Sequence, residues 1–228
     1  MAVMFLTVSN AFSQNLRPDN LPKYDMSPYH FGFIIGLNQM HFVVKPIKDF
    51  QKQDTIYVVQ AQPEMGFNIG IVSNLRLGEY FDLRFIPTLS FGERTMSFTR
   101  AINDTNFFQT NKKVESTYLD FPLEIKFKSK RMHNTRAYVL TGFKYSLDLA
   151  SQAKKIETDQ EIRIKLKKND YSFEFGVGFD FYTTYFKFGT EIKMAYGLRD
   201  LLNHENNIYA NTIDRLNSKI FQFTLTFE

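Results

Sequence analysis

Hydrophobic and polar residues alternate along eight segments of the chain. In the most regular of them, residues 170–181, Tyr, Phe or Val fills every odd position and a small or acidic residue fills every even one. A period of two places successive side chains on opposite faces of a β-strand, so each segment predicts a strand with one apolar face and one polar face. The predicted strands are residues 29–38, 67–74, 81–91, 117–127, 136–148, 170–181, 186–196 and 219–227.

The polar faces carry opposite charges two residues apart, as in Asp82 and Arg84 or Glu191 and Lys193. Such side chains point to the same side of a strand, and in the interior of a small barrel they pair with one another and with trapped water. The large apolar face then meets lipid, with tyrosines near the strand ends as interfacial anchors, and glycines of the polar face leave room for the long side chains. The predicted lumen network consists of Asp82, Arg84, Glu124, Lys126, Lys144, Asp148, Glu174, Glu191 and Lys193.

The connections between these strands are alternately short and long. Short turns are expected around residues 77–79, 129–135 and 182–184, and long connections over residues 42–64, 92–116, 150–169 and 198–217. Short periplasmic turns with long outer loops are typical of outer-membrane barrels, and an even strand number places both ends of the barrel in the periplasm. The sequence therefore predicts an all-β fold, an eight-stranded antiparallel up-and-down transmembrane β-barrel over residues 29–228. A secreted soluble β-sandwich is the alternative that the alternation leaves open.

Composition narrows the classes of protein further. The chain has 228 residues, enough for one domain or at most a small pair. It contains no cysteine, which excludes a disulfide scaffold and any cysteine-ligated metal site. It has no uninterrupted apolar run near ~20 residues, which excludes a membrane-spanning helix. The formal net charge of +4 is too small and too interspersed to indicate a nucleic-acid partner.

The N-terminus has the pattern of a sorting signal. Residues 1–13 carry no charge and end in Ala11-Phe12-Ser13, which places small residues three and one before Gln14. This is the pattern of a signal-peptidase site. We therefore expect residues 1–13 to be a signal peptide and residues 14–28 to be a short periplasmic segment. A buried N-terminal strand is the alternative for residues 1–13.

No group of residues indicates catalysis, a cofactor or a metal ion. None of the four histidines lies at a metal-ligand spacing from another, and no motif joins Ser90 or Ser146 to a histidine, as a hydrolase would need. The glycines of residues 175–180 lack the helix and the Lys-Ser/Thr pair of a phosphate-binding loop. We therefore predict a protein that is not an enzyme and needs no cofactor.

Basic side chains are concentrated in the predicted connection 150–169. They are candidates for binding the phosphates of lipopolysaccharide or an acidic partner, and an ordinary solvated loop is the alternative. The residues are Lys154, Lys155, Arg163, Lys165, Lys167 and Lys168.

Six stretches, in order along nearly the whole predicted mature chain, carry a resemblance to a known family. They are residues 29–36 (YHFGFIIG), 70–80 (GIVSNLRLGEY), 83–92 (LRFIPTLSFG), 115–122 (ESTYLDFP), 144–151 (KYSLDLAS) and 214–221 (DRLNSKIF). In these stretches the chain resembles the PorT/SprT family, outer-membrane barrel components of the type IX secretion system of Bacteroidota.

The resemblance implies a part in exporting proteins with C-terminal sorting domains and, in gliding species, in motility. It brings no catalytic or cofactor residues. The partners it implies are other components of that secretion system and outer-membrane lipid. An autonomous small barrel that stabilises the envelope or adheres to a surface is one alternative, and a lipid-acting barrel enzyme is another. Candidate partner-contact residues in the predicted connections are Phe107, Phe108, Lys130, Arg131, Arg199 and Asp200.

Overall fold

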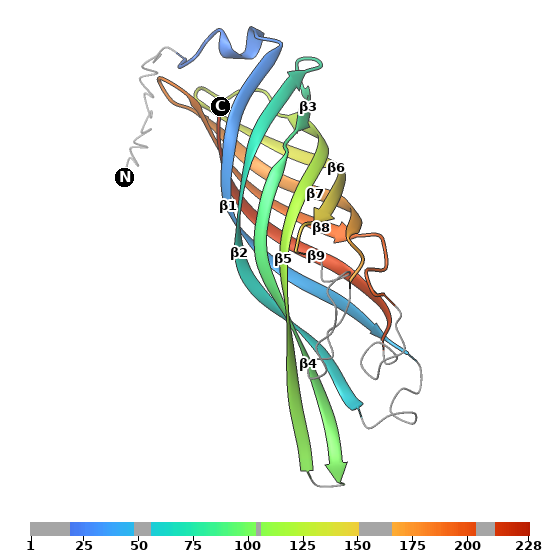
Figure 1. Cartoon of the computed structure of the whole chain (residues 1–228). Coiled ribbons are helices and arrows are strands. Elements are labelled where there is room, and N and C mark those ends of the chain that lie inside the picture. The colour runs from blue at the N-terminus through green and yellow to red at the C-terminus, as the bar shows by residue number, and fades with distance from the viewer. Residues whose placement is uncertain (1–18, 48–55, 104–105, 151–165, 204–212) are drawn as a thin grey trace, which may run out of the picture.

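The structure, a computed structural model, describes residues 19–47, 56–103, 106–150, 166–203 and 213–228 and forms one antiparallel sheet closed on itself (Figure 1). A short 3-10 helix, η1 (Tyr24–Met26), precedes the first strand. No helix of the described residues is long and apolar enough to cross a membrane. The strands are β1 (Tyr29–Pro46), β2 (Ile56–Arg76), β3 (Phe81–Phe85), β4 (Thr88–Asn103), β5 (Asn106–Lys128), β6 (Thr135–Asp148), β7 (Asn169–Tyr182), β8 (Lys187–Gly197) and β9 (Ile213–Phe227).

The nine strands fill eight positions in the barrel wall, because β3 and β4 are two halves of one strand. Both pair with β2 on one side and with β5 on the other, without a change of register between them. The break falls at Ile86-Pro87, where the proline has no amide hydrogen to donate, and opposite Pro122 of β5, which also lacks one. Pairing of β1 with β9, beginning at Phe33 and Phe227, closes the ring. The predicted eight-stranded up-and-down barrel is confirmed.

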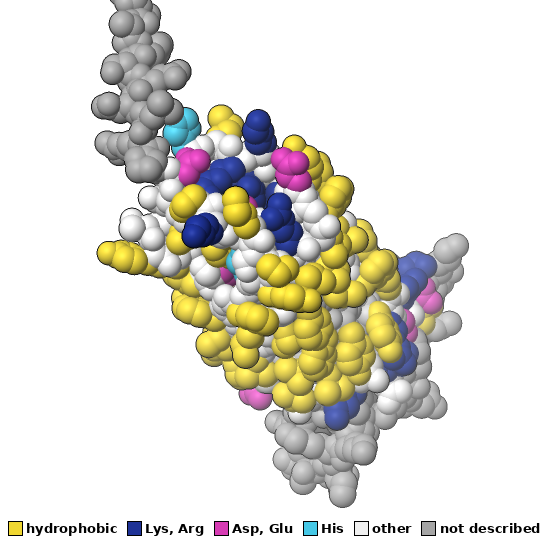
Figure 2. Space-filling model, turned by 90° about the horizontal axis from the view of Figure 1, so that it is seen from above, with side chains coloured by type: hydrophobic (Ala, Val, Ile, Leu, Met, Phe, Trp, Pro, Cys, Tyr) yellow, Lys and Arg dark blue, Asp and Glu magenta, His cyan; other side chains and the backbone are white. Residues whose placement is uncertain are grey.

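The two faces of the wall differ in chemistry along each regular strand. In β7 the even residues are buried over the full length of the strand, and the odd residues from Tyr171 to Phe181 are exposed. Aromatic rings of neighbouring strands stack on the outer face, as in Phe33 on Phe227 with ring centroids 4.9 Å apart. Hydrophobic side chains therefore cover the side of the barrel, below an end where lysine and arginine gather (Figure 2).

Two of the predicted long connections are mostly strand, so the prediction of loops there is wrong. β1 and β2 extend into residues 42–64, and β4 and β5 form a long hairpin over residues 92–116 that projects beyond the rest of the barrel (Figure 1). The hairpin has polar residues at successive positions, such as Glu93-Arg94-Thr95 and Lys112-Lys113, so no apolar alternation marks it as a strand. β9 likewise begins at Ile213, before the predicted start at residue 219.

The barrel has two distinct ends. The short turns after β2, β5 and β7 lie at one end together with η1 and the C-terminus, and we call this the turn end (Figure 1). The β4–β5 hairpin lies at the opposite end, which we call the loop end. The predicted signal peptide (residues 1–13) and residues 151–165 and 204–212 of the predicted connections lie outside the described residues.

Candidate functional site: a charged lumen closed at both ends

A chain of ion pairs crosses the middle of the lumen. Arg84 of β3 lies with Nη1 2.5 Å from Oε1 of Glu191 on β8 and 3.8 Å from Oε2 of Glu124 on β5. Lys193 Nζ lies 2.9 Å from Glu124 Oε1, and the Tyr138 hydroxyl donates to Glu191 Oε1 over 2.8 Å. The Arg84, Glu124 and Glu191 side chains are fully buried. Because opposite walls of the barrel supply these groups, the network ties β3, β5, β6 and β8 together.

A second cluster lies toward the loop end. Lys144 Nζ is 3.0 Å from Glu174 Oε1 and 3.8 Å from Asp120 Oδ2. The Asp120 carboxylate also accepts hydrogen bonds from the hydroxyls of Ser90 (2.8 Å) and Ser146 (2.5 Å). Four strands, β4 to β7, thus contribute to one polar cluster.

Further pairs lie toward the turn end. Lys126 Nζ contacts Asp180 at 2.8 Å and sits over the Tyr138 ring, 3.5 Å from its centroid. Gly178 of β7 makes room for that ring, since a Cβ there would lie 2.5 Å from the Tyr138 hydroxyl. Lys128 Nζ lies 2.6 Å from Asp82 Oδ1.

All nine residues of the predicted lumen network are buried inside the barrel. Their partners differ from the expected neighbours two residues apart: the closest contacts join different strands, and Glu191 lies 3.9 Å from Lys193 but closer to Arg84. Asp148 accepts a hydrogen bond from the amide of Ala150 over 2.9 Å, so it caps the strand end. The prediction omitted Asp120, Lys128, Asp180, Lys187 and Glu228, although Asp120 and Asp180 occupy the same polar faces.

The N-terminal segment closes the turn end. The Tyr24 ring stacks on His30 with centroids 3.9 Å apart, and its hydroxyl donates to Glu228 Oε2, which also pairs with Lys187 at 2.9 Å. Burial raises the pKa of Tyr24 well above its ordinary value. The cavity beneath this segment is about 10 Å³, room for about one water molecule.

Asp25 fastens this segment to the barrel rim. Its carboxylate accepts two hydrogen bonds from Arg136, at 2.9 and 3.0 Å, and one from the Tyr182 hydroxyl at 3.1 Å. Burial alone would raise the pKa of Asp25, but the Arg136 charge and these hydrogen bonds outweigh it and hold the pKa below its ordinary value.

The basic turn after β5 also holds the N-terminal segment at the barrel rim. Arg131 donates to the backbone oxygen of Asn20 and to Asn134 Oδ1, and its guanidinium lies 3.8 Å from the centroid of the Tyr182 ring. Lys130 is exposed at the turn end. Of the two candidate contact residues here, Lys130 is therefore free to meet a partner, whereas Arg131 holds the N-terminal segment.

An apolar cluster fills the lumen at the loop end. Its members are buried side chains of strands and of the connections before β7 and after β8: Phe42, Met96, Leu166, Leu201, Leu202, Ile213 and Leu216. Asp200 holds the connection in place, since its Oδ1 accepts hydrogen bonds from the amides of Leu202 and Leu216 and its Oδ2 lies 3.8 Å from Lys167 Nζ.

The other loop-end candidates are placed differently. Arg199 is exposed. Phe107 and Phe108 lie in β5, where their backbones pair with Ala101 and Arg100, and their side chains are outside the described part of the chain. Of the predicted lipopolysaccharide-binding residues only Lys167 and Lys168 are among the described residues. Within the described ranges, no group of three or more His, Asp or Glu side chains could hold a metal ion.

Comparison with known proteins agrees with this architecture. A family model described as "Outer membrane protein beta-barrel domain" matches residues 12–203. The chain belongs to this outer-membrane β-barrel family. An outer-membrane location follows for the chain. No curated protein sequence matches it.

Similar solved structures are outer-membrane barrels of low sequence identity. Ail, the attachment invasion locus protein of Yersinia pestis, solved with the heparin analogue sucrose octasulfate, is 11% identical over 88% of this chain and 99% of its own, with a TM-score of 0.41. OprG of Pseudomonas aeruginosa is 10% identical over 86% and 94% of the two chains, with a TM-score of 0.44. The N-terminal barrel domain of OprF from the same organism is 13% identical over 85% and 96%, with a TM-score of 0.33.

In this outer-membrane barrel, Asp25→Asn is expected to release the N-terminal segment from the rim. The amide keeps an acceptor for Tyr182 but loses the charge that pairs with Arg136. Trypsin cleavage after the exposed Lys23 measures the release, and we expect it to be several-fold faster in the variant, with Asp19→Asn unchanged as the control.

Acid is expected to act on the same contact. Because the pKa of Asp25 is lowered in the folded state, the carboxylate stabilises docking above its ordinary pKa and loses this effect as the pH falls through the lowered value. Docking is thus retained at neutral pH and weakened only in strong acid. Equal cleavage rates of wild type and Asp25→Asn at neutral pH would contradict this role of Asp25.

Proposed function

We propose that this barrel is a non-enzymatic component of the type IX secretion system, needed for export of proteins with C-terminal sorting domains and acting through protein–protein contacts. In this proposal the turn end faces the periplasm and the loop end faces outward. Its partners are other components of that system. The six stretches that resemble the PorT/SprT family carry the proposal.

The positions of these stretches in the barrel support it. They include Arg84 of the central ion-pair chain and Asp120 and Lys144 of the second cluster. They also include the break between β3 and β4, where the Ile86 amide donates to the Pro122 carbonyl of β5 and Pro87 follows directly. The resemblance therefore extends to residues that lie in contact and give this barrel its particular interior, beyond the alternation common to small barrels.

A closed lumen favours action at the ends of the barrel over conduction through it. The interior is crossed by ion pairs, one end is covered by the N-terminal segment and the other is filled by the apolar cluster. Eight strands leave room for side chains but not for an open pore. The exposed Lys130 at the turn end and Arg199 at the loop end are the described candidates for partner contacts.

Deletion of the gene and complementation with a tagged copy tests the proposal. The expected result is a tagged protein in the outer-membrane fraction, and a deletion strain that retains cargo with C-terminal sorting domains in the periplasm. Normal secretion together with a fragile or poorly adhering envelope would contradict the proposal and support an autonomous barrel. The hairpin of β4 and β5, which projects at the loop end, is the feature that favours that alternative (Figure 1).

A further inference from the structure

The barrel wall splits between β1 and β2 toward the loop end. Pairing of these strands ends at Met40 and Glu64. Beyond that point β1 stays paired with β9 as far as Pro46, and β2 stays paired with β4 back to Ile56. Residues 41–46 and 56–63 therefore each have one edge that pairs with no other described strand. We call the space between these two edges the slot.

The sequence of β2 accounts for the split. Pro63 has no amide hydrogen, so it cannot donate to a strand on the β1 side. The register of β2 against β4 also shifts between Pro63 and Phe67, a bulge that bends the strand. β1 and β2 thus diverge directly after Met40, and the split follows from the proline and the bulge in β2.

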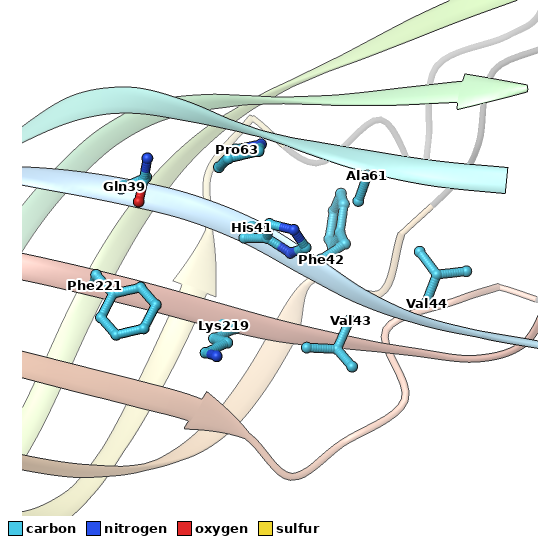
Figure 3. A pocket seen from close by; sticks show the side chains of 9 residues that line it. All are labelled: Gln39, His41, Phe42, Val43, Val44, Ala61, Pro63, Lys219 and Phe221. Carbon is cyan, nitrogen blue, oxygen red and sulfur yellow. The ribbon is translucent and has the colours of Figure 1, made fainter.

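A pocket of about 400 Å³ lies at the free edge of β1 (Figure 3). Its lining combines side chains of β1, β2 and β9: Gln39, His41, Phe42, Val43, Val44, Ala61, Pro63, Lys219 and Phe221. On the inner side, Phe42 belongs to the apolar cluster of the loop end, and Val44 and Ala61 pack against it. On the outer side, His41 and Lys219 are register partners, and Nδ1 of His41 is buried without a hydrogen-bond partner.

We propose that the slot binds an extended segment of another polypeptide, which adds to the free strand edges as a further β-strand. Free edges present backbone donors and acceptors that a strand satisfies. The free segments, residues 41–46 and 56–63, have the length of an ordinary strand. The slot also lies beyond the lipid-facing part of the wall, because the exposed apolar residues of the outer face end at Leu37 on β1 and at Phe221 on β9. A bound strand would therefore not have to enter lipid.

The lining specifies the chemistry of the bound segment. Alternate side chains of a strand point to opposite faces. One set meets Phe42, Val44 and Ala61 and is therefore apolar, whereas the other set lies on the side of His41 and Lys219 and is polar or acidic. The inference concerns an alternating peptide and does not rest on the secretion role proposed above.

The test uses the absence of cysteine from the chain, which makes a single introduced thiol unique. Val43→Cys places a thiol in the slot, and Ile35→Cys is the matched control, on the same face of β1 where the strand is paired on both sides with Ile69 and Leu225. The probe is a synthetic eight-residue peptide of alternating valine and threonine or glutamate, with one cysteine carried as its 2-pyridyl disulfide, so that the barrel thiolate displaces pyridine-2-thione and no oxidant is needed. Its control is the same peptide with every second backbone amide N-methylated.

We expect the purified, folded Val43→Cys barrel to form a disulfide with the unmethylated peptide at least ten-fold faster than either control combination. Equal rates for the two variants, or for the two peptides, would overturn the proposal because backbone pairing at the slot would not be required. A Val43→Cys thiol that resists a small thiol reagent would mean that the chain itself covers the slot. A Val43→Cys disulfide dimer that forms without peptide once an oxidant is added, and that Ile35→Cys does not form, would identify a second copy as the occupant. Each of these two outcomes also contradicts the proposal.

Discussion

Replacing Arg84 by methionine is expected to lower the free energy of unfolding by about 3–5 kcal/mol, because it leaves buried carboxylates without their cation. Arg84 is fully buried, and its Nη1 contacts Glu191 at 2.5 Å and Glu124 at 3.8 Å. Lys193 remains near both acids but is a single charge for two. Urea unfolding of the barrel in detergent micelles, followed by the gel shift between folded and heated protein, gives this free energy.

Two further variants distinguish the loss of this ion pair from a general loss of stability. Adding Glu191→Gln to Arg84→Met removes one of the two stranded charges, and we expect the double variant to recover at least ~1 kcal/mol of the loss. Lys45→Met breaks the ion pair with Asp214, 3.2 Å long and with both side chains more than half exposed, and is expected to change stability by less than ~1 kcal/mol. If Arg84→Met were as mild as Lys45→Met, the central chain of ion pairs would have no role in stability.

The barrel could be predicted from sequence because its signal is local. In β6 and β7 the side chains alternate between lipid and lumen without interruption, and a period of two needs only neighbouring residues to be seen. The same reasoning identifies the polar face and therefore which charges lie in the lumen.

The partners within the lumen could not be predicted in the same way. Arg84 lies two residues from Asp82, yet it pairs with Glu191, whose position depends on the closure and stagger of the whole barrel. Register is set by all the strands together, so cross-lumen pairs are a property of the closed ring.

The strand extensions and the split were missed for another reason. The β4–β5 hairpin projects beyond the apolar outer face and has polar residues at consecutive positions, so its strands lack the hydrophobic period of two. They are nevertheless paired, Glu93 with Glu115 and Arg94 with Val114. Pro63 alone gave a sequence signal for the split, since proline is found at strand edges and bulges.

The assignment of faces predicts a second large effect, in β7. Phe175 lies near the middle of the strand on the lipid face and is 48% exposed. Phe175→Lys is expected to destabilise the inserted barrel by about 2–4 kcal/mol and to block insertion, because a lysine then meets hydrocarbon near the bilayer midplane.

Two matched variants in the same strand test whether the effect depends on depth in the bilayer and on the face of the strand. Phe181→Lys, on the same face near the turn end, is expected to cost about 0–1 kcal/mol, since the penalty falls toward the interface. Glu174 faces the lumen, where its Oε1 lies 3.0 Å from Lys144 Nζ, and Glu174→Gln keeps a polar oxygen at this place, so it is expected to be much milder than Phe175→Lys. The folded fraction after refolding into lipid vesicles measures all three. Equal damage from Phe175→Lys and Glu174→Gln would mean that the outer and inner faces of β7 are wrongly assigned. On the present assignment, Phe175→Lys forces a charge into hydrocarbon, whereas Glu174→Gln only removes a charge inside the polar lumen.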